Sequence, residues 1–161
     1  MTGSSYEREL VGRLERARFA VMRAPSSGSA TERELPDIRA IRDGYNEPYS
    51  WAIEAKANSR PLIYLDATEI DKLRTFAALG GHEVLLAGRW KQDHDTGWNQ
   101  HNDAFDAKAW YLYHPDDVHR TGENGDGGNY RLKRPDRDGA ETPRYVVTNT
   151  ADGARVRVGE K

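Results

Sequence analysis

A continuous apolar segment, residues 82–90 (HEVLLAGRW), constrains the fold of this chain more than any other feature. A short run of this kind, between a Gly-Gly pair and a polar stretch, predicts a strand buried inside a sheet. The residues before it, 67–79, place Ile70, Leu73 and Phe76 on one face of a helix. Asp66 or Thr68 is placed to cap that helix, and Gly80-Gly81 ends it. A helix leading directly into a buried strand indicates a sheet with helical cover.

The rest of the chain supplies further elements of both kinds. A helix is predicted over residues 5–18, and a polar stretch at about 91–107 is expected to be an inserted loop. Residues 135–161 are expected to form a polar C-terminal extension with one weak hairpin. The sequence therefore predicts an α/β fold with a mixed central β-sheet flanked by α-helices. The strands are expected at residues 19–24, 37–42, 50–56, 82–90, 109–113, 130–133, 145–148 and 156–158.

Composition excludes several classes of protein. The 161 residues include no cysteine, so a thiol nucleophile, a disulfide framework and a Cys-ligated zinc site are excluded. No apolar stretch is long enough to span a membrane, and the first residues lack the features of a signal peptide, so a cytoplasmic protein is expected. The net charge of −2 and the pI near 6.2 speak against an ordinary nucleic-acid-binding protein.

Two carboxylates and an amine fall at one end of a predicted hairpin. Asp37 opens one strand, and Glu54 and Lys56 close the next. Residues two apart in a strand point to the same side, so Glu54 and Lys56 share a face, and the hairpin brings Asp37 beside Glu54. Oxygen ligands of this kind suit a hard divalent cation. Taken singly, Glu-x-Lys is also typical of a surface ion pair and Pro-Asp of a turn.

Glu7 is unusual for its place on the first predicted helix. It shares the inward stripe of Leu10, Val11 and Leu14, where a carboxylate is costly unless it is paired or close to a metal. Alternatively, Ser4 and Glu7 form a capping box at the start of that helix. Arg23 ends the following strand, just before a loop of small residues.

These residues fall within a longer ordered pattern that resembles the archaeal Holliday junction resolvases, which are restriction-endonuclease-like PD-(D/E)xK nucleases. The segments that carry the resemblance are Glu7–Leu10, Phe19–Pro25, Ser27–Ser29, Pro36–Ile38, Ile53–Lys56 and Ile63–Leu65. Trp110–Pro115 and Gly127–Arg131 resemble the haloarchaeal branch in particular. The resemblance implies a nuclease domain over residues 1–134.

The resemblance also implies roles for individual residues. Glu7, Asp37 and Glu54 match metal-binding carboxylates, with the Ala55 carbonyl as a further ligand, and Lys56 matches the catalytic lysine. Ser29 matches a catalytic position that also contacts DNA. Arg8, Arg23 and Ser27 match positions that contact DNA.

The implied activity is Mg²⁺-dependent resolution of four-way DNA junctions by a homodimer, with Mn²⁺ expected to substitute. Further arginines are expected to contact phosphates with steep salt dependence: Arg13, Arg16, Arg39 and Arg42. The dimer interface is expected near the helix at 70–79 and its neighbouring strand.

Three other functions remain open at this point. One is a nuclease of the same fold that acts on another DNA substrate, and another is a non-catalytic junction-binding protein. A hydrolase of small phosphoesters is the third. The His and Asp residues between positions 93 and 103 are expected to be a solvated loop rather than a metal site, and Trp90 and Trp110 are expected to be core residues rather than base-stacking ones.

Overall fold

The computed structural model describes residues 3–24, 35–44, 48–91, 101–102, 105–122 and 128–159. Two α-helices, α1 (Gly3–Arg16) and α2 (Ala67–Gly80), and a short 3-10 helix (Pro115–Asp117) accompany the strands. The strands of the main sheet are β1 (Ala20–Arg23), β2 (Ile38–Arg42), β3 (Tyr49–Asn58), β5 (Glu83–Trp90), β8 (Trp110–Tyr113), β11 (Tyr145–Thr150) and β12 (Gly153–Val158). The other strands are β4 (Leu62–Asp66), β6 (His101–Asn102), β7 (Phe105–Asp106), β9 (His119–Arg120) and β10 (Asn129–Lys133).

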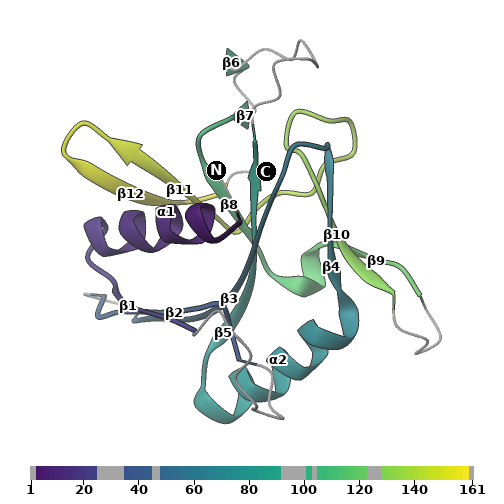
Figure 1. The fold of residues 1–161 in the computed structure, drawn as a ribbon, viewed down its shortest axis with the longest axis horizontal. Coiled ribbons are helices and arrows are strands. Elements are labelled where there is room, and N and C mark those ends of the chain that lie inside the picture. The colour runs from purple at the N-terminus through teal and green to yellow at the C-terminus, as the bar shows by residue number, and fades with distance from the viewer. Residues whose placement is uncertain are drawn as a thin grey trace.

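The main sheet is mixed. Its seven strands follow the order β1-β2-β3-β5-β8-β11-β12. β3 and β5 are parallel, because the chain crosses over between them through β4 and α2, whereas the other neighbouring strands are antiparallel. A second sheet of three strands, in the order β4-β10-β9, stands beside the first, and α1 and α2 lie on opposite faces of the main sheet (Figure 1).

Each face of the main sheet packs against a separate hydrophobic core. Leu10 and Leu14 of α1 pack with Trp51, Leu85 and their neighbours on one side. The other core holds α2, the inner face of β4 and β10, and the alternate residues of β5. The alternation of buried side chains along the strands therefore fixes both layers. Trp90 and Trp110 are completely buried, as predicted.

The two ends of helix α2 are set by residues that the sequence predicts. The Asp66 carboxylate accepts hydrogen bonds from the amides of Thr68 and Glu69 at 2.8 and 3.2 Å, so Asp66 rather than Thr68 is the cap. Gly81 ends the helix with φ of 70°, a left-handed conformation that glycine adopts without strain.

Some elements differ from the prediction. The strand β4 was not predicted, because it runs into α2 without a turn between them. The weak hairpin predicted in residues 135–161 is present as β11 and β12, but β11 also pairs with β8, so the extension is part of the main sheet. Strands β6 and β7 fall within the expected insert, whose residues 92–100 and 103–104 lie outside the described ranges. No helix in the described part of the chain is long and apolar enough to cross a membrane.

Candidate active site

The hairpin of β2 and β3 places two carboxyl groups side by side. Ile38 is the register partner of Ile53, so Asp37, just before β2, lies opposite Glu54. The Ala55 amide donates a hydrogen bond to Asp37 Oδ2 at 3.0 Å. The Glu54 side chain lies close enough to lower the pKa of Asp37. The predicted pairing of these two acids is therefore present in the structure.

The helix α1 adds a third carboxylate from above this edge of the sheet. Glu7 Oε1 and Arg23 Nε lie 3.3 Å apart and form an ion pair. Arg23 ends β1, whose register pairs it with Ile38, and the Ala24 amide donates to the Asp37 carbonyl at 2.9 Å. The capping-box alternative depends on the Ser4 side chain, which lies outside the described residues. The ion pair with Arg23 directs Glu7 toward the site.

Burial and repulsion make these acids hold protons more tightly than usual. The pKa of Glu7 is raised, first by burial and then by the negative charge of Asp37, although Arg23 opposes both effects. Burial also raises the pKa of Asp37, against the lowering effects of the Ala55 amide, Glu54 and Arg23. Arg23 therefore acts on both Glu7 and Asp37, and burial still leaves the pKa of each acid above its usual value.

This donor set fits a hard divalent cation. Two neighbouring carboxylates repel each other when both are ionised, and a bound cation relieves that repulsion. Asp37 and Glu54 would hold such an ion, with the Ala55 carbonyl beside them. Glu7 would lie close enough to attract the ion electrostatically. Among the described residues, no three His, Asp or Glu side chains form a ready-made metal cage. The acids meet instead as two overlapping pairs, Glu7 with Asp37 and Asp37 with Glu54.

Lys56 lies on the same strand as Glu54 but has a different partner. Its side chain is exposed, and Nζ donates a hydrogen bond to the Tyr64 carbonyl on β4 at 2.8 Å. Lys56 comes two residues after Glu54 on β3, and its hydrogen bond joins β3 to β4 of the second sheet.

The residues expected to contact DNA lie in different surroundings in the structure. Arg8 is exposed beside Glu7 on α1, and Arg23 faces the acids. Ser27 and Ser29 lie outside the described residues. Arg13 was predicted to bind phosphate, but it is 3% exposed and donates to the carbonyls of Lys108 and Val147, so that prediction is wrong.

Two other arginines from the expected set have protein partners. Arg16 donates to Asn149 at 2.8 Å. Arg42 donates to the Ala17 carbonyl at 3.1 Å and covers the rings of Phe19 and Tyr49. These contacts hold α1 and the hairpin to their neighbours, so both side chains are already engaged within the fold.

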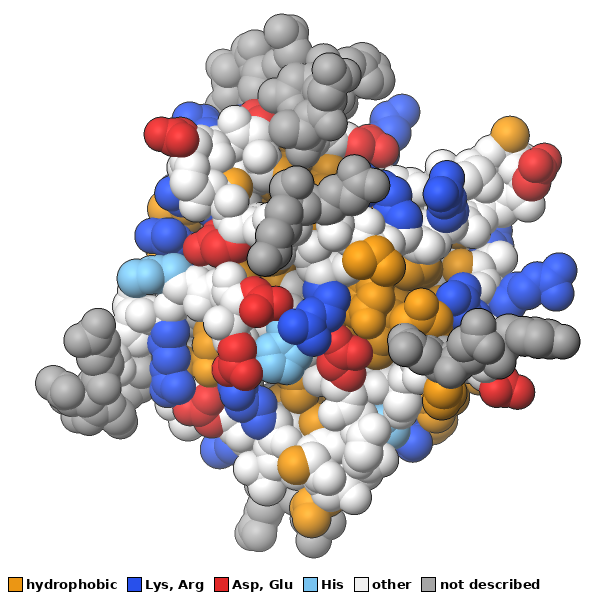
Figure 2. Space-filling view, turned by 180° about the vertical axis from the view of Figure 1, so that it is seen from behind, with side chains coloured by type: hydrophobic (Ala, Val, Ile, Leu, Met, Phe, Trp, Pro, Cys, Tyr) orange, Lys and Arg blue, Asp and Glu red, His pale blue; other side chains and the backbone are white. Residues whose placement is uncertain are grey.

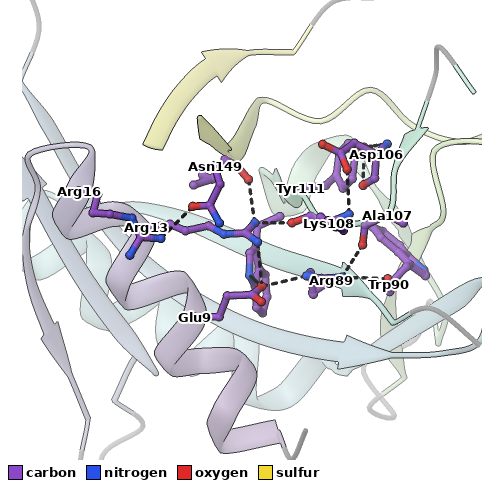
Figure 3. Close-up of polar contacts among 12 residues, drawn as sticks. Glu9, Arg13, Arg16, Arg89, Trp90, Asp106, Ala107, Lys108, Tyr111 and Asn149 are labelled. Atoms are coloured by element: carbon purple, nitrogen blue, oxygen red, sulfur yellow. Dashed lines mark hydrogen bonds and ion pairs between the residues drawn. The ribbon is translucent and has the colours of Figure 1, made fainter. Parts of the chain in front are cut away.

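A second polar cluster, missed in the sequence, lies further along α1. Glu9 Oε1 accepts from Arg89 Nε and Trp110 Nε1, both at 2.9 Å, and lies 3.4 Å from Arg13 (Figure 3). Arg89 also donates to the Ala107 carbonyl. The spacing of Glu9 and Arg13 at i and i+4 was a visible signal of a helical ion pair. We call these four residues, Glu9, Arg13, Arg89 and Trp110, the Glu9 cluster.

The chain is similar to known proteins over most of its length. Residues 1–147 match the family model described as archaeal Holliday junction resolvase. The chain is 39% identical over 85 residues to the crossover junction endodeoxyribonuclease Hjc of Sulfurisphaera tokodaii, a match that covers 52% of this chain and 56% of that protein. It is 33% identical over 91 residues to the protein of the same name from Sulfolobus acidocaldarius, covering 56% of this chain and 62% of that protein. The chain thus matches little more than half the length of these relatives.

A solved structure extends the similarity to the fold. The Hjc Holliday junction resolvase of Archaeoglobus fulgidus superposes with a TM-score of 0.60 at 27% identity, covering 81% of this chain and 88% of the other. This match confirms the predicted restriction-endonuclease-like α/β fold. With the family model matching residues 1–147, the chain belongs to the archaeal Holliday junction resolvase family, Hjc.

Proposed function

We propose that this chain is a divalent-metal-dependent endodeoxyribonuclease that resolves four-way DNA junctions by paired nicks. The observation that carries the proposal is the placement of Asp37 opposite Glu54, with Glu7 beside Asp37, in a member of a resolvase family. Carboxylates gathered at one place repel a phosphate unless a cation intervenes. A chain that only bound DNA would gain nothing from such a cluster.

The residues of the site divide the work. Asp37 and Glu54 would hold the ion, and the Ala55 amide keeps the Asp37 carboxylate in place. When bound, Mg²⁺, or Mn²⁺ in its place, neutralises charge on a phosphate and makes water a better nucleophile. Arg23 has a guanidinium group at the acids and can contact a non-bridging phosphate oxygen.

Lys56 and Ser29 complete the proposed machinery. Lys56 is held at the edge of the site through the Tyr64 carbonyl, and its ammonium can turn toward a phosphate that lies over Glu54. There it would orient the attacking water or stabilise negative charge that develops on the phosphate. Ser27, Ser29 and Arg8 would contact the DNA strand.

Symmetric resolution requires two sites and therefore a two-fold dimer. An apolar surface beside the acids suits this role. Met22 of β1 and Leu79 of α2 are 69% and 87% exposed, and Met22 and Phe76 line a shallow hollow that Arg23 also borders. We propose that two copies meet there, near the predicted 70–79 helix. We also propose that the protein acts on DNA in the cytoplasm.

Cleavage of defined DNA structures tests the proposal. Synthetic four-way junctions, linear duplexes and flaps are incubated with Mg²⁺, Mn²⁺ or a chelator, and nicks on opposing strands are mapped. We expect symmetric paired nicks in junctions, only with a divalent cation. Glu54→Gln should remove cleavage and keep junction binding, whereas Glu15→Gln, an exposed position on α1, should cut like the wild type.

The same assay separates the alternatives. Preferred cutting of duplexes or flaps identifies a nuclease with another DNA substrate. Junctions that are bound but never cut identify a non-catalytic binding protein. Hydrolysis of small phosphoesters without any DNA cleavage identifies the third class, and each of these results overturns the proposed function.

A further inference from the structure

A groove next to the acids has no role in the mechanism above. It is open, has a volume of about 650 Å³, and lies between the start of β4 and the turn that follows β10. That size falls within the range of ligand-binding sites in proteins. We call it the β4 groove, and the lining residues that matter here are Arg60, Leu62, Tyr64, Lys133, Arg137 and Asp138.

Strand alternation exposes this surface. Ile63 and Leu65 of β4 are buried in the core, so Leu62 and Tyr64 face outward, and Tyr64 is 41% exposed. Lys133 is the register partner of Leu62 on β10 and shares that outer face. The outer face of the three-stranded sheet therefore presents an aromatic ring and an apolar side chain next to a cation.

The charges of the groove are unbalanced in a way that is unusual for this protein. It contains three basic side chains and one acid, although the whole chain has a net charge of −2. Many described arginines pair with acids, for example Arg74, Arg120 and Arg144. Figure 2 shows acidic and basic side chains interspersed over one face of the molecule. In the groove, basic side chains are not matched by an equal number of acidic ones.

Its cations are available to a partner. Lys133 Nζ donates to the backbone carbonyl of Asp138 at 3.1 Å, and not to the carboxylate. Arg60 and Arg137 are exposed, and neither guanidinium group forms an ion pair with an acid in the described part of the chain. Forked donors without an acidic partner suit phosphate oxygens.

The groove continues from the active site. Lys56 follows Glu54 on β3 and donates to the carbonyl of Tyr64, whose side chain lines the groove. The four residue steps from Glu54 to Asn58 extend by roughly 13 Å, which equals about four base-pair rises of DNA. Arg60 of the groove comes two residues after Asn58, so a DNA arm that has a phosphate at the acids is long enough to reach the groove.

We propose that the β4 groove binds the phosphate backbone of one junction arm, about four base pairs from the cleaved bond. Arg60, Lys133 and Arg137 contact successive phosphates, and Tyr64 and Leu62 pack against the sugars. The groove holds the arm so that one phosphate stays over Asp37 and Glu54. This inference rests on the proposed function, because it assumes a DNA substrate.

Binding without cleavage tests the groove separately from the chemistry. The dissociation constant of a four-way junction is measured without divalent cation over a range of salt concentrations. The variant is Arg60→Ala/Arg137→Ala, and the matched control is Arg155→Ala/Arg157→Ala, which removes two exposed arginines from β12. A thermal melt of each variant establishes that it folds.

The groove variant should bind several-fold more weakly, and its salt slope should fall by about 1 to 2 because one or two phosphate contacts are lost. The control should match the wild type. Neutral methylphosphonate linkages placed about four base pairs from the cut should weaken the wild type and leave the variant unchanged. A groove variant with wild-type affinity and salt slope overturns the groove proposal. A wild type that binds junctions but never cuts them overturns the proposed function and leaves the groove proposal standing.

Discussion

Two glutamates on the same helix, Glu7 and Glu9, have opposite surroundings. Glu9 has two arginines and an indole N–H around its carboxylate, and all three donors come from buried or nearly buried side chains. Glu7 has one arginine and faces a second acid, Asp37. The first carboxylate is balanced by the protein itself, whereas the second requires a positive charge from outside.

This difference separates a structural from a functional carboxylate within two residues of sequence. The Glu9 cluster joins α1 to β5, β8 and the carbonyls near residue 107 (Figure 3), and it fixes the rotation of the helix. Because that rotation is fixed, Glu7 points at Asp37 from the same helix. The Glu9 cluster, in which the charges are balanced by the protein, thus positions Glu7 beside Asp37.

The largest effect is expected when Asp37 becomes asparagine. Asp37 belongs to both acid pairs of the site, so its loss removes the centre of the proposed metal ligands. We expect Asp37→Asn to lower the rate of junction cleavage about 10³-fold or more, with junction affinity almost unchanged. Single-turnover cleavage and binding in chelator measure the two quantities.

Stability should behave differently in the same variant. Asparagine keeps an oxygen that accepts from the Ala55 amide and removes a repelling charge, so the free energy of unfolding should stay equal or rise. Asp43→Asn, at an exposed position after β2, is the matched control and should cut normally. Wild-type cleavage by Asp37→Asn contradicts the assignment of the site.

A smaller but opposite effect is expected at Glu9. Glu9→Gln keeps the shape and one acceptor but leaves Arg13 and Arg89, which are 3% and 8% exposed, without a counter-charge. Breaking a buried pair in this way costs about 3–5 kcal/mol. Urea unfolding should show that loss, whereas Glu7→Gln should change the free energy of unfolding little.

A double-mutant cycle sharpens this result. Combining Glu9→Gln with Arg89→Met removes both sides of the contact, so the double variant should lose less stability than the sum of the single losses. Equal losses for Glu7→Gln and Glu9→Gln would remove the distinction between the two carboxylates.

The sequence predicts the active-site pairing well because the signal is local. Asp37 and Glu54 occupy the two strands of one hairpin, so alternation and a single turn suffice to bring them together. The Glu9 cluster could not be predicted in full, because Arg89 and Trp110 are 80 and 101 residues away from Glu9. For the same reason Arg13 was assigned to the DNA surface, although the fold buries it.

The fold shows the same division between local and long-range information. The predicted helix at 67–79 and strand at 82–90 correspond to α2 and β5, since periodicity and the glycine stop are local signals. The strand β4 was missed because Asp66 both ends the strand and caps the helix, so no turn residue separates them. The junction of β11 with β8 depends on a pairing between distant segments.

The smallest effect concerns pH. The raised pKa values of Glu7 and Asp37 mean that the folded protein binds more protons than the unfolded chain, from about pH 4 upward. Stability therefore falls as pH rises through this range, by the linkage between proton binding and folding. The two acids contribute no such penalty at lower pH, where both states are protonated.

Urea unfolding in chelator, compared between the wild type and Glu7→Gln/Asp37→Asn, isolates this contribution. The variant should gain stability over the wild type as the pH increases from about 4 to 7. Millimolar Mg²⁺ should reduce that gain, because a cation bound to the wild-type acids replaces the protons and stabilises the folded state. A difference that does not change with pH would show that Glu7 is as well balanced as Glu9.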